Sequence, residues 1–217
     1  LAKASSQSLS ISDGSQSGLD FSGNFSFSAW IKLSQLPSTA GTRFMIFSKY
    51  NQNTAPTGYQ IFIDTSDKLN MEWTNGSGGL SRAVASSAFV GGDVGTWIHI
   101  AGAATVATPT IALYKNGSSF SSSMTFSTAT TIGGNGETFY VGASYNGSVV
   151  EFFDGSIDEG YMWSRAITSG DVTTLYNGGS GYTWGLSDGL VSYWKLDESS
   201  GDAADSVGSN TLTNANT

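Results

Sequence analysis

Hydrophobic and polar residues alternate along most of the chain with a period of two. In FSFSAWIKL, residues 25–33, every odd-numbered position is apolar, whereas the positions between them carry Ser26, Ser28, Trp30 and Lys32. Successive side chains of a β-strand point to opposite faces, so this pattern predicts a strand with one buried face. Similar patterns predict further strands within residues 58–64, 68–74, 96–103, 110–117, 138–144, 155–164 and 189–197.

Turn signals separate the expected strands. Residues 64–68, DTSDK, and the Asn116-Gly117 pair have the composition of tight turns between antiparallel strands. Within residues 155–164, continued alternation places Tyr161 and Trp163 on the core face. Nine or more short strands joined by such turns predict an all-β, two-sheet antiparallel sandwich of the jelly-roll kind.

One segment departs from the alternation and follows helical spacing instead. Thr168 is followed three residues later by Asp171, which is the spacing of a helix-capping box. Val172 and Leu175 then lie three positions apart, as on one face of a helix. We therefore expect one short helix near residues 169–177, covering an end of the sandwich.

The composition supports a folded β protein and argues against several classes of function. Aromatic residues make up 12% of the 217 residues, which is enough material for a core. The chain has no cysteine, so disulfides and thiolate metal sites are excluded. The net charge is −8 without basic clusters, and no apolar run approaches the roughly 20 residues of a membrane-spanning helix. We therefore expect neither a nucleic-acid partner nor membrane insertion.

Several motifs resemble a known family. FSFSAWIKL, GYQIFIDTSDKL, WIHIAGAATVATPTIALYKNG and FFDGSIDEGYMWSRAITSGDVTTLYN follow one another as in laminin-G-like jelly-roll modules of the concanavalin A-like lectin/glucanase superfamily. The last motif, a Gly-x-Ile-Asp-Glu strand followed by an Arg-Ala turn and a short helix, is the most specific. The resemblance covers about residues 5–190 and implies a two-sheet antiparallel sandwich.

The C-terminal segment, residues 189–217, resembles the beginning of such a module, so the order of the chain is permuted. Two interpretations compete. The segment either folds back and completes this sandwich, giving a single domain over residues 1–217, or it belongs to the next module of a tandem array. We favour completion because it covers sheet edges that would otherwise be open. The chain begins at Leu1 rather than Met, and we expect it to be part of a longer protein with neighbouring modules.

Three carboxylates, Asp154, Asp158 and Glu159, are crowded into residues 152–167. A glycoside hydrolase needs two carboxyl groups that flank the scissile bond. The glucanases that this chain resembles carry Glu-x-Asp-x-x-Glu on one strand, and that motif is absent here. Asp158 and Glu159 are neighbours on an expected strand, so they should point to opposite faces and cannot act as a pair. We therefore predict that the protein is not an enzyme.

The resemblance also implies a structural calcium ion at the rim of the sandwich. Carried over by position, its ligands would be Asp158, Glu198 and Asp205, with Asp197 as a further candidate. Carboxylate and carbonyl oxygens are the ligands that calcium prefers. This site requires the C-terminal segment to fold back. The alternative is that Asp158 binds turn amides and that the acidic segment is solvated.

Aromatic residues on outward-facing strand positions are candidates for sugar binding, because sugar rings stack on aromatic rings. We select Trp30, Phe62 and Tyr114 from such positions, and Tyr145 and Asn146 from a loop. The alternative is that helices, loops or the C-terminal segment cover them. The full set of outward aromatic positions is Trp30, Phe62, Trp97, Tyr114 and Tyr140.

Together these features predict a noncatalytic carbohydrate-binding or adhesion module, acting on a glycan or polysaccharide surface. We expect it in a larger extracellular, cell-surface or virion-surface protein. The alternative is a structural spacer or protein-interaction module in a tandem-repeat chain, followed by a glycoside hydrolase. An exposed Trp or Tyr beside Asn or Asp would favour sugar binding. Two carboxylates about 5–9 Å apart across a groove would favour hydrolysis.

Overall fold

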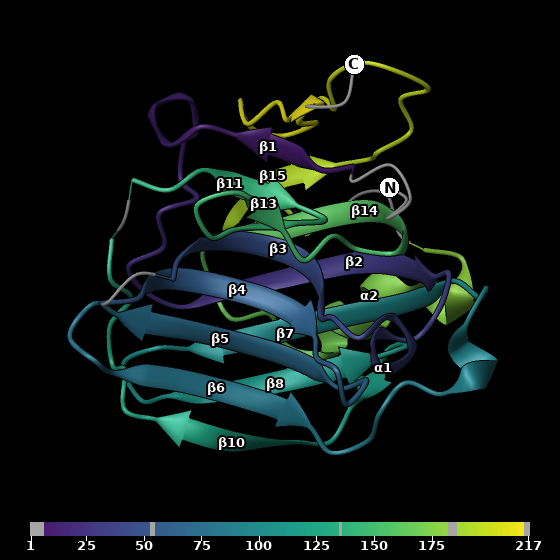
Figure 1. The fold of residues 1–217 in the computed structure, drawn as a ribbon, viewed down its shortest axis with the longest axis horizontal. Helices are drawn as coiled ribbons and strands as arrows, with labels where there is room; N and C mark the ends of the chain where they lie inside the picture. Colours follow the sequence, from purple (N-terminus) through teal and green to yellow (C-terminus); the bar gives the residue numbers. More distant parts are fainter. Residues whose placement is uncertain (1–6, 53–54, 135, 182–185, 215–217) are drawn as a thin grey trace.

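The computed structural model describes residues 7–52, 55–134, 136–181 and 186–214. Two sheets face each other, and the ladders between their strands are antiparallel (Figure 1). The larger sheet has the order β10 (Ser122–Ser127), β6 (Leu80–Ala85), β5 (Leu69–Asn75), β4 (Thr57–Ile63), β3 (Phe44–Asn51), β11 (Phe139–Val141), β1 (Leu9–Ile11), β16 (Thr213–Asn214). The smaller sheet has the order β15 (Leu190–Trp194), β14 (Gly155–Trp163), β2 (Phe25–Leu33), β7 (Ile98–Thr105), β8 (Thr110–Lys115), β9 (Ser118–Ser119).

Shorter elements complete the chain. The hairpin of β12 (Ser144–Tyr145) and β13 (Val149–Val150) forms a small separate sheet. The α-helices are α1 (Pro37–Ala40), which is a single turn that the sequence pattern did not predict, and α2 (Ser169–Tyr176). Among the described residues, short 3-10 helices span Asp13–Ser15, Gly91–Asp93 and Asn177–Gly179.

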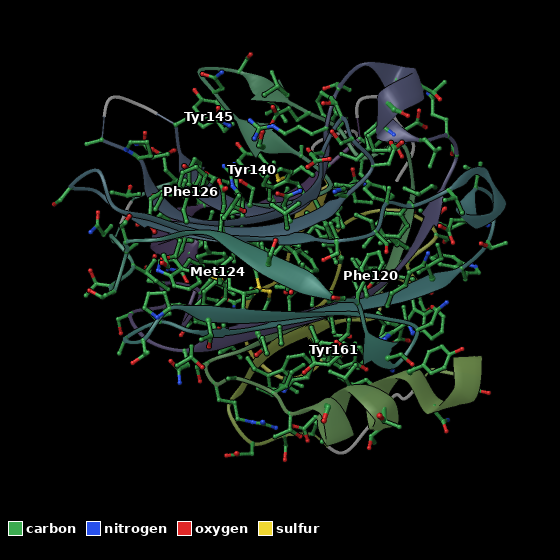
Figure 2. All side chains as sticks on the ribbon, turned by 90° about the horizontal axis from the view of Figure 1, so that it is seen from below. Phe120, Met124, Phe126, Tyr140, Tyr145 and Tyr161 are labelled. Carbon is green, nitrogen blue, oxygen red and sulfur yellow. The ribbon has the colours of Figure 1, made fainter. Side chains whose placement is uncertain are left out.

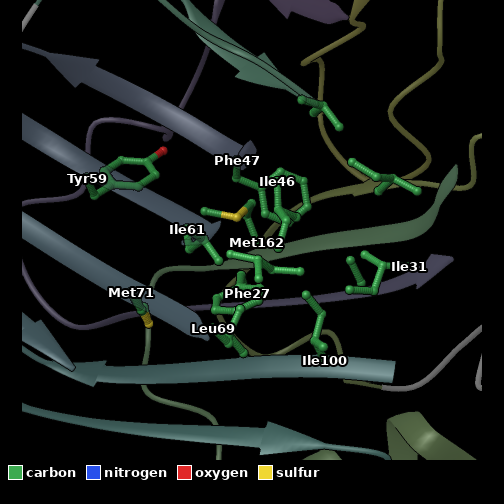
Figure 3. Packing of buried hydrophobic residues seen from close by; sticks show 14 of the residues in the cluster. Phe27, Ile31, Ile46, Phe47, Tyr59, Ile61, Leu69, Met71, Ile100 and Met162 are labelled. Atoms are coloured by element: carbon green, nitrogen blue, oxygen red, sulfur yellow. The ribbon is translucent and has the colours of Figure 1, made fainter. Parts of the chain in front are cut away.

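The core lies between the two sheets and is built by the alternation seen in the sequence. The odd-numbered residues of β2 are fully buried, and they face the inward residues of β3, β4 and β5 (Figure 3). Phe27 and Phe47 meet edge to face across the sheets, with ring centroids 6.2 Å apart. The predicted all-β sandwich is confirmed, and its inward face is the one that the period of two identifies.

The two predicted turns are also confirmed. In the β4–β5 hairpin, the Asp64 amide donates to the Lys68 carbonyl at 2.9 Å, and Asp67 has a positive φ of 62°. Between β8 and β9, Asn116 and Gly117 have φ values of 50° and 75°. Two successive positive φ values are the geometry that favours Asn-Gly in a two-residue hairpin loop.

The C-terminal segment folds back and extends both sheets. Strand β15 pairs with β14 at the edge of the smaller sheet, and β16 pairs with β1 at the edge of the larger one. Trp194 is fully buried and stacks on Phe139, with ring centroids 5.5 Å apart. Residues far apart in sequence therefore share one core, as the completion hypothesis expects.

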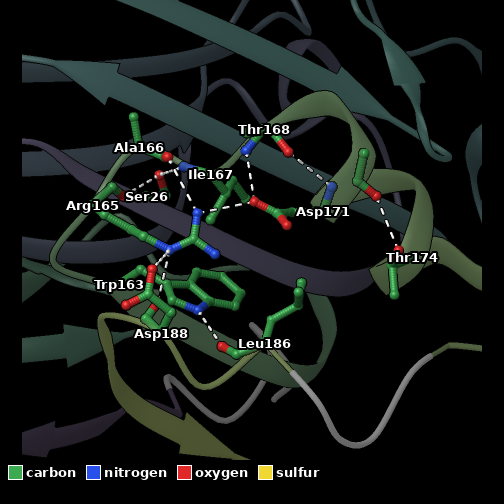
Figure 4. A network of polar contacts seen from close by, with 11 residues as sticks. Ser26, Trp163, Arg165, Ala166, Ile167, Thr168, Asp171, Thr174, Leu186 and Asp188 are labelled. Carbon is green, nitrogen blue, oxygen red and sulfur yellow. Dashed lines mark hydrogen bonds and ion pairs between the residues drawn. The ribbon is translucent and has the colours of Figure 1, made fainter.

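Helix α2 begins and ends as the sequence predicted. The Thr168 hydroxyl accepts from the Asp171 amide at 3.2 Å, and the Asp171 carboxylate accepts from the Thr168 amide at 2.8 Å. Arg165 connects this carboxylate to the segment before β15 (Figure 4). Its Nη1 donates to the Asp171 carboxylate at 2.9 Å, and its Nε donates to the Asp188 carbonyl at 2.7 Å. These contacts hold the helix against the outer face of the smaller sheet.

A β-bulge in β14 corrects the predicted face of two aromatic residues. Asp158 pairs with Trp30, but the next pair along β2 joins Tyr161 to Ser28, so two residues of β14 oppose one of β2. The bulge reverses the alternation, and Met162 instead of its neighbours enters the core between the sheets. Tyr161 and Trp163 lie on the outer face, where they form a second buried cluster under α2.

Candidate functional site

Three side chains form a row across the outer face of the smaller sheet. Trp30 of β2 pairs with Asp158 of β14 on one side and with His99 of β7 on the other. Paired residues of antiparallel strands project from the same face. The row ends beside the C-terminal turn of α2, so a ring, a carboxylate and an imidazole lie next to one another.

Trp30 and Asp158 of this row line a pocket of about 250 Å³. Trp97, directly before β7, forms another part of its wall, and its side chain is 43% exposed. The Lys32 ammonium lies 5.1 Å from the centre of the Trp97 ring. The pocket is lined by Trp30, Trp97, Asp158, Glu159, Gly179, Ser180 and Gly181. An exposed tryptophan that shares a pocket with an aspartate is a combination that favours sugar binding.

Trp30 is held in a defined orientation. Its ring stacks on Tyr176 of α2 with centroids 5.9 Å apart, and lies 5.4 Å from the ring of His99. His99 Nε2 and the Ser28 hydroxyl are 2.8 Å apart and share a hydrogen bond. Burial lowers the pKa of His99 to about 4, so the imidazole is neutral at pH 7. The partly exposed Trp30 ring therefore rests on a rigid, uncharged support.

The two neighbouring carboxylates reach the same pocket, which corrects the expectation that they point to opposite faces. The bulge places Glu159 at a positive φ of 49°, which turns its side chain towards the side of Asp158. The hydroxyls of Tyr161, at 3.2 Å, and Tyr193 both donate to Glu159 Oε2. Glu159 is thus held by the aromatic cluster under α2, and both acids stand on one side of the pocket.

Asp158 is the more accessible acceptor of the two carboxylates. Among the described residues, its side chain accepts a single hydrogen bond, from the Glu159 amide at 3.1 Å. Burial and the negative charges of Glu159 and Asp197 raise the pKa of Asp158 to about 6. Asp158 is therefore ionised at pH 7 and can accept hydrogen bonds from a ligand.

Two of the five predicted ligand residues are covered. Phe62 is 3% exposed because the guanidinium of Arg43 lies over its ring, 5.1 Å from the ring centre. Tyr114 is 8% exposed because α2 covers it together with Trp163. Outward-facing strand positions need not be exposed, since helices and long side chains can cover them.

Tyr145 and Asn146 lie on a different part of the surface from Trp30. Both are exposed in the β12–β13 hairpin, and the Tyr145 ring is stacked parallel to Tyr140 at 6.5 Å. Figure 2 shows this tyrosine pair on the side of the sandwich opposite to the green helix α2. The predicted ligand residues thus do not form one site, and Trp30 alone of the five lies in the pocket.

The four predicted calcium ligands do not converge either. Asp205 accepts from three backbone amides, including that of Tyr193 at 3.0 Å, and so organises the C-terminal segment. Glu198 lines a separate hollow, and Asp197 acts on Asp158 through charge. Within the described ranges, no group of three or more acidic or histidine side chains is arranged to hold a metal ion. In this arrangement these residues do not fit the predicted calcium site, which would need the four carboxylates to come together around the ion.

The wall formed by Gly179–Gly181 was not predicted. This segment follows Asn177, which ends α2 at a positive φ of 47°. Gly181 approaches Trp30 closely, since a β-carbon there would lie 3.4 Å from Trp30 Nε1. The Asn-Gly-Gly run after the helix signals such a turn, but only the fold shows that the turn meets Trp30.

Residues 3–173, more than half of the chain, match the family model described as the concanavalin A-like lectin/glucanases superfamily. The chain therefore belongs to this superfamily. No curated protein matches it. Among the described residues, no helix is long and apolar enough to span a membrane.

Solved structures with the same fold include several binding proteins. A candidate carbohydrate-binding protein from Bacteroides ovatus has a TM-score of 0.66 and 17% identity, and the match covers 96% of this chain and 56% of that one. A SAP-like pentraxin from Limulus polyphemus has a TM-score of 0.54 and 15% identity, covering 96% and 94%. A Ruminococcus gnavus sialidase module, CBM40, bound to α2,3-sialyllactose has a TM-score of 0.55 and 15% identity, covering 71% and 83%. At these identities the likeness shows the fold.

Proposed function

We propose that this chain is a noncatalytic carbohydrate-binding module that holds a neutral sugar unit in the Trp30–Trp97 pocket. The observation that carries the proposal is that an exposed and a partly exposed tryptophan line the same pocket as an ionised aspartate. Sugar rings present apolar C–H faces that stack on indole rings, while their hydroxyls need acceptors.

Each group has a distinct role in the proposed complex. The Trp97 ring offers the exposed stacking surface, and Trp30 forms a wall fixed by Tyr176 and His99. Asp158 accepts hydrogen bonds from sugar hydroxyls. Both tryptophans and Asp158 belong to or adjoin paired strands. Because these residues are already held in place, little conformational freedom is lost when a ligand binds.

The arrangement of the acids supports a noncatalytic role. A hydrolase needs one carboxyl group on each side of the glycosidic bond, about 5–9 Å apart. Asp158 and Glu159 are adjacent in the chain and stand on one side of the pocket, and Glu159 is engaged by two tyrosine hydroxyls. This geometry suits binding better than bond cleavage.

The fold neighbours support the same class of function and a place outside the cell. They include a candidate carbohydrate-binding protein, a module bound to sialyllactose and the receptor-binding domain of a botulinum neurotoxin. This chain spans 56% of the Bacteroides ovatus structure. We propose that it acts as one module of a larger extracellular or surface protein.

Affinity electrophoresis and calorimetry with a panel of neutral polysaccharides test the proposal. We expect Trp97→Ala to weaken binding about tenfold or more, because stacking on the exposed ring is lost. Val207→Ala is the matched control, since Val207 is 44% exposed and lies outside the pocket. Tyr145→Ala tests the tyrosine pair as the competing site.

Loss of binding in Tyr145→Ala but not in Trp97→Ala would move the site to the β12–β13 hairpin. If the unaltered chain bound no polysaccharide of the panel, the spacer or protein-interaction alternative would replace the proposal. Melting curves of each variant show whether a loss of binding reflects a loss of fold.

A further inference from the structure

A second pocket lies on the opposite face of the molecule, over the larger sheet. Its volume is about 420 Å³. Arg43 precedes β3, Phe62 lies on β4 and Arg82 on β6, and the order β6-β5-β4-β3 of the larger sheet brings these side chains to one surface. The pocket is lined by Thr42, Arg43, Phe62, Asp64, Thr65, Asn70, Arg82 and Glu151.

Two guanidinium groups share the Phe62 ring. The Cζ atoms of Arg43 and Arg82 lie 5.1 and 6.0 Å from the centre of this ring. The side chains of both arginines are partly exposed, at 28% and 30%. Stacking on an aromatic ring fixes the plane of each guanidinium while its edge stays available for hydrogen bonds.

Each arginine uses a single nitrogen for its internal ion pair. Arg43 Nε donates to Glu151 at 2.5 Å, and Arg82 Nε donates to the buried Glu72. In the part of the chain that the structure describes, Nη1 and Nη2 of both arginines have no hydrogen-bond partner. The paired Nη atoms form the planar donor edge that matches a carboxylate.

The acidic residues of this pocket already accept hydrogen bonds from other groups of the protein. Glu151 accepts from Arg43 and from the Ser144 hydroxyl at 2.8 Å. Asp64 Oδ1 accepts from the Ser66 and Lys68 amides, and its Oδ2 accepts from the Asn70 side chain. The carboxylates are therefore turned to internal donors, and the groups left for a ligand are the two guanidinium edges.

The rim adds neutral polar groups. The hydroxyls of Thr42 and Thr65 form no hydrogen bond among the described residues. A ligand that carries both a carboxylate and hydroxyl groups would contact the guanidinium groups as well as the threonine hydroxyls. A uronic acid carries a carboxylate that can face the arginines and hydroxyl groups that can contact the threonines, so an acidic saccharide matches both parts of the pocket.

We propose that the Arg43–Phe62–Arg82 pocket binds the carboxylate of an acidic sugar, such as a uronic-acid residue. The carboxylate lies between the two guanidinium edges, and the sugar hydroxyls contact Thr42 and Thr65. This site is separate from the Trp30–Trp97 pocket and does not depend on the function proposed for it.

Calorimetry of the full chain with trigalacturonic acid tests the proposal, with neutral galactose oligomers as the control ligand. Arg43→Lys/Arg82→Lys is the decisive variant, because it keeps the net charge of −8 but removes both donor forks. We expect about tenfold or greater weakening of binding. The control variant Lys195→Gln removes one positive charge in the C-terminal segment and should bind as the unaltered chain does.

Several results would overturn the proposal. These are no binding of the uronate by the unaltered chain, equal binding of the neutral oligomer, or unchanged affinity in the double-lysine variant. Stronger binding of inorganic sulfate than of the uronate would assign a simple anion site instead.

Two further variants keep the test decisive. If the double-lysine variant fails to fold, Thr65→Ala replaces it, since this exposed side chain has no structural bond to lose, and a several-fold weakening is expected. Trp97→Ala should bind the uronate normally, so that failure of either pocket is seen independently of the other.

Discussion

The two outer faces of the sandwich have the same strand pattern beneath them but different surroundings. On the smaller sheet, α2 covers an aromatic cluster that includes Tyr161 and Trp163, and the open remainder is an acidic pocket. On the side of the larger sheet, Phe126 of β10 and Tyr145 of the β12–β13 hairpin remain 47% and 40% exposed (Figure 2). The pocket on that side includes Arg43 and Arg82. Outward-facing side chains thus become core or surface according to the element that lies over them.

The largest expected difference between the faces is in stability. Trp163→Ala should lower the free energy of unfolding by about 3–5 kcal/mol, because a fully buried ring leaves a cavity under α2. Phe126→Ala on the larger sheet should cost less than about 1 kcal/mol, since its ring is half exposed. Urea denaturation measures both values. Similar losses for the two variants would show that the faces do not differ in this way.

The next effect concerns the histidine beneath Trp30. Its pKa is lowered to about 4, so the unfolded chain takes up a proton near pH 6.5 before the folded chain does. Protonation of His99 in the unfolded chain should therefore lower the free energy of unfolding by about 3 kcal/mol as the pH falls from 6.5 to 4. The His99→Gln variant should lack this loss, and denaturation curves at several pH values would show it. A parallel pH dependence of variant and unaltered chain would contradict the buried neutral state.

A smaller effect of opposite sign comes from Asp158. The pKa of Asp158 is raised to about 6 in the folded chain. Between the ordinary aspartate pKa and about pH 6, the folded chain therefore keeps a proton on Asp158 that the unfolded chain has released. This contribution stabilises the fold at low pH and is lost as the pH rises through 6. Asp158→Asn should then be about 1 kcal/mol more stable than the unaltered chain at pH 7, allowing for solvent screening, and equal to it near pH 3.5.

The same variant separates stability from binding. If Asp158 accepts sugar hydroxyls, Asp158→Asn weakens binding to neutral polysaccharides at pH 7 although it stabilises the fold. Binding by the unaltered chain should also weaken below pH 6. Unchanged affinity together with higher stability would leave Asp158 without a role in the pocket.

The smallest expected effect is that of calcium. Asp205 already accepts hydrogen bonds from three backbone amides, and among the described residues the four predicted ligands do not converge, so EDTA or added calcium should leave the melting temperature unchanged. A calcium-dependent rise that Asp205→Asn or Asp158→Asn abolishes would show that these carboxylates come together around the ion. Thermal melts of the full chain decide between the two outcomes.

Much of the fold could be predicted from local patterns. The alternation in residues 25–33 marked the inward face of β2 correctly, and the Thr168–Asp171 pair marked the start of α2. The failures have local causes. The alternation could not anticipate the bulge at Glu159, where one extra residue reverses the faces of the following residues of β14.

The sites were less predictable. Trp30 and Asp158 were both selected from the sequence, but for different ligands, and only their pairing in adjacent strands shows that they share a pocket. The Arg43–Phe62–Arg82 pocket has no sequence motif. Arg43, Phe62 and Arg82 come from three separate segments, and only the order of the strands in the larger sheet brings them together.

The sequence by itself determined many of the strands, the inward face of residues 25–33, the two turns and helix α2, because these depend on contacts between near neighbours in the chain. The tertiary structure decided which outward side chains are covered, which acids share a pocket and where the C-terminal segment pairs. Those outcomes depend on contacts between distant segments, as when β15 and β16 close the two sheets and α2 covers Tyr114. No spacing along the chain encodes such contacts, so the exposed Trp97 ring and the two arginine edges became candidate sites only in the folded protein.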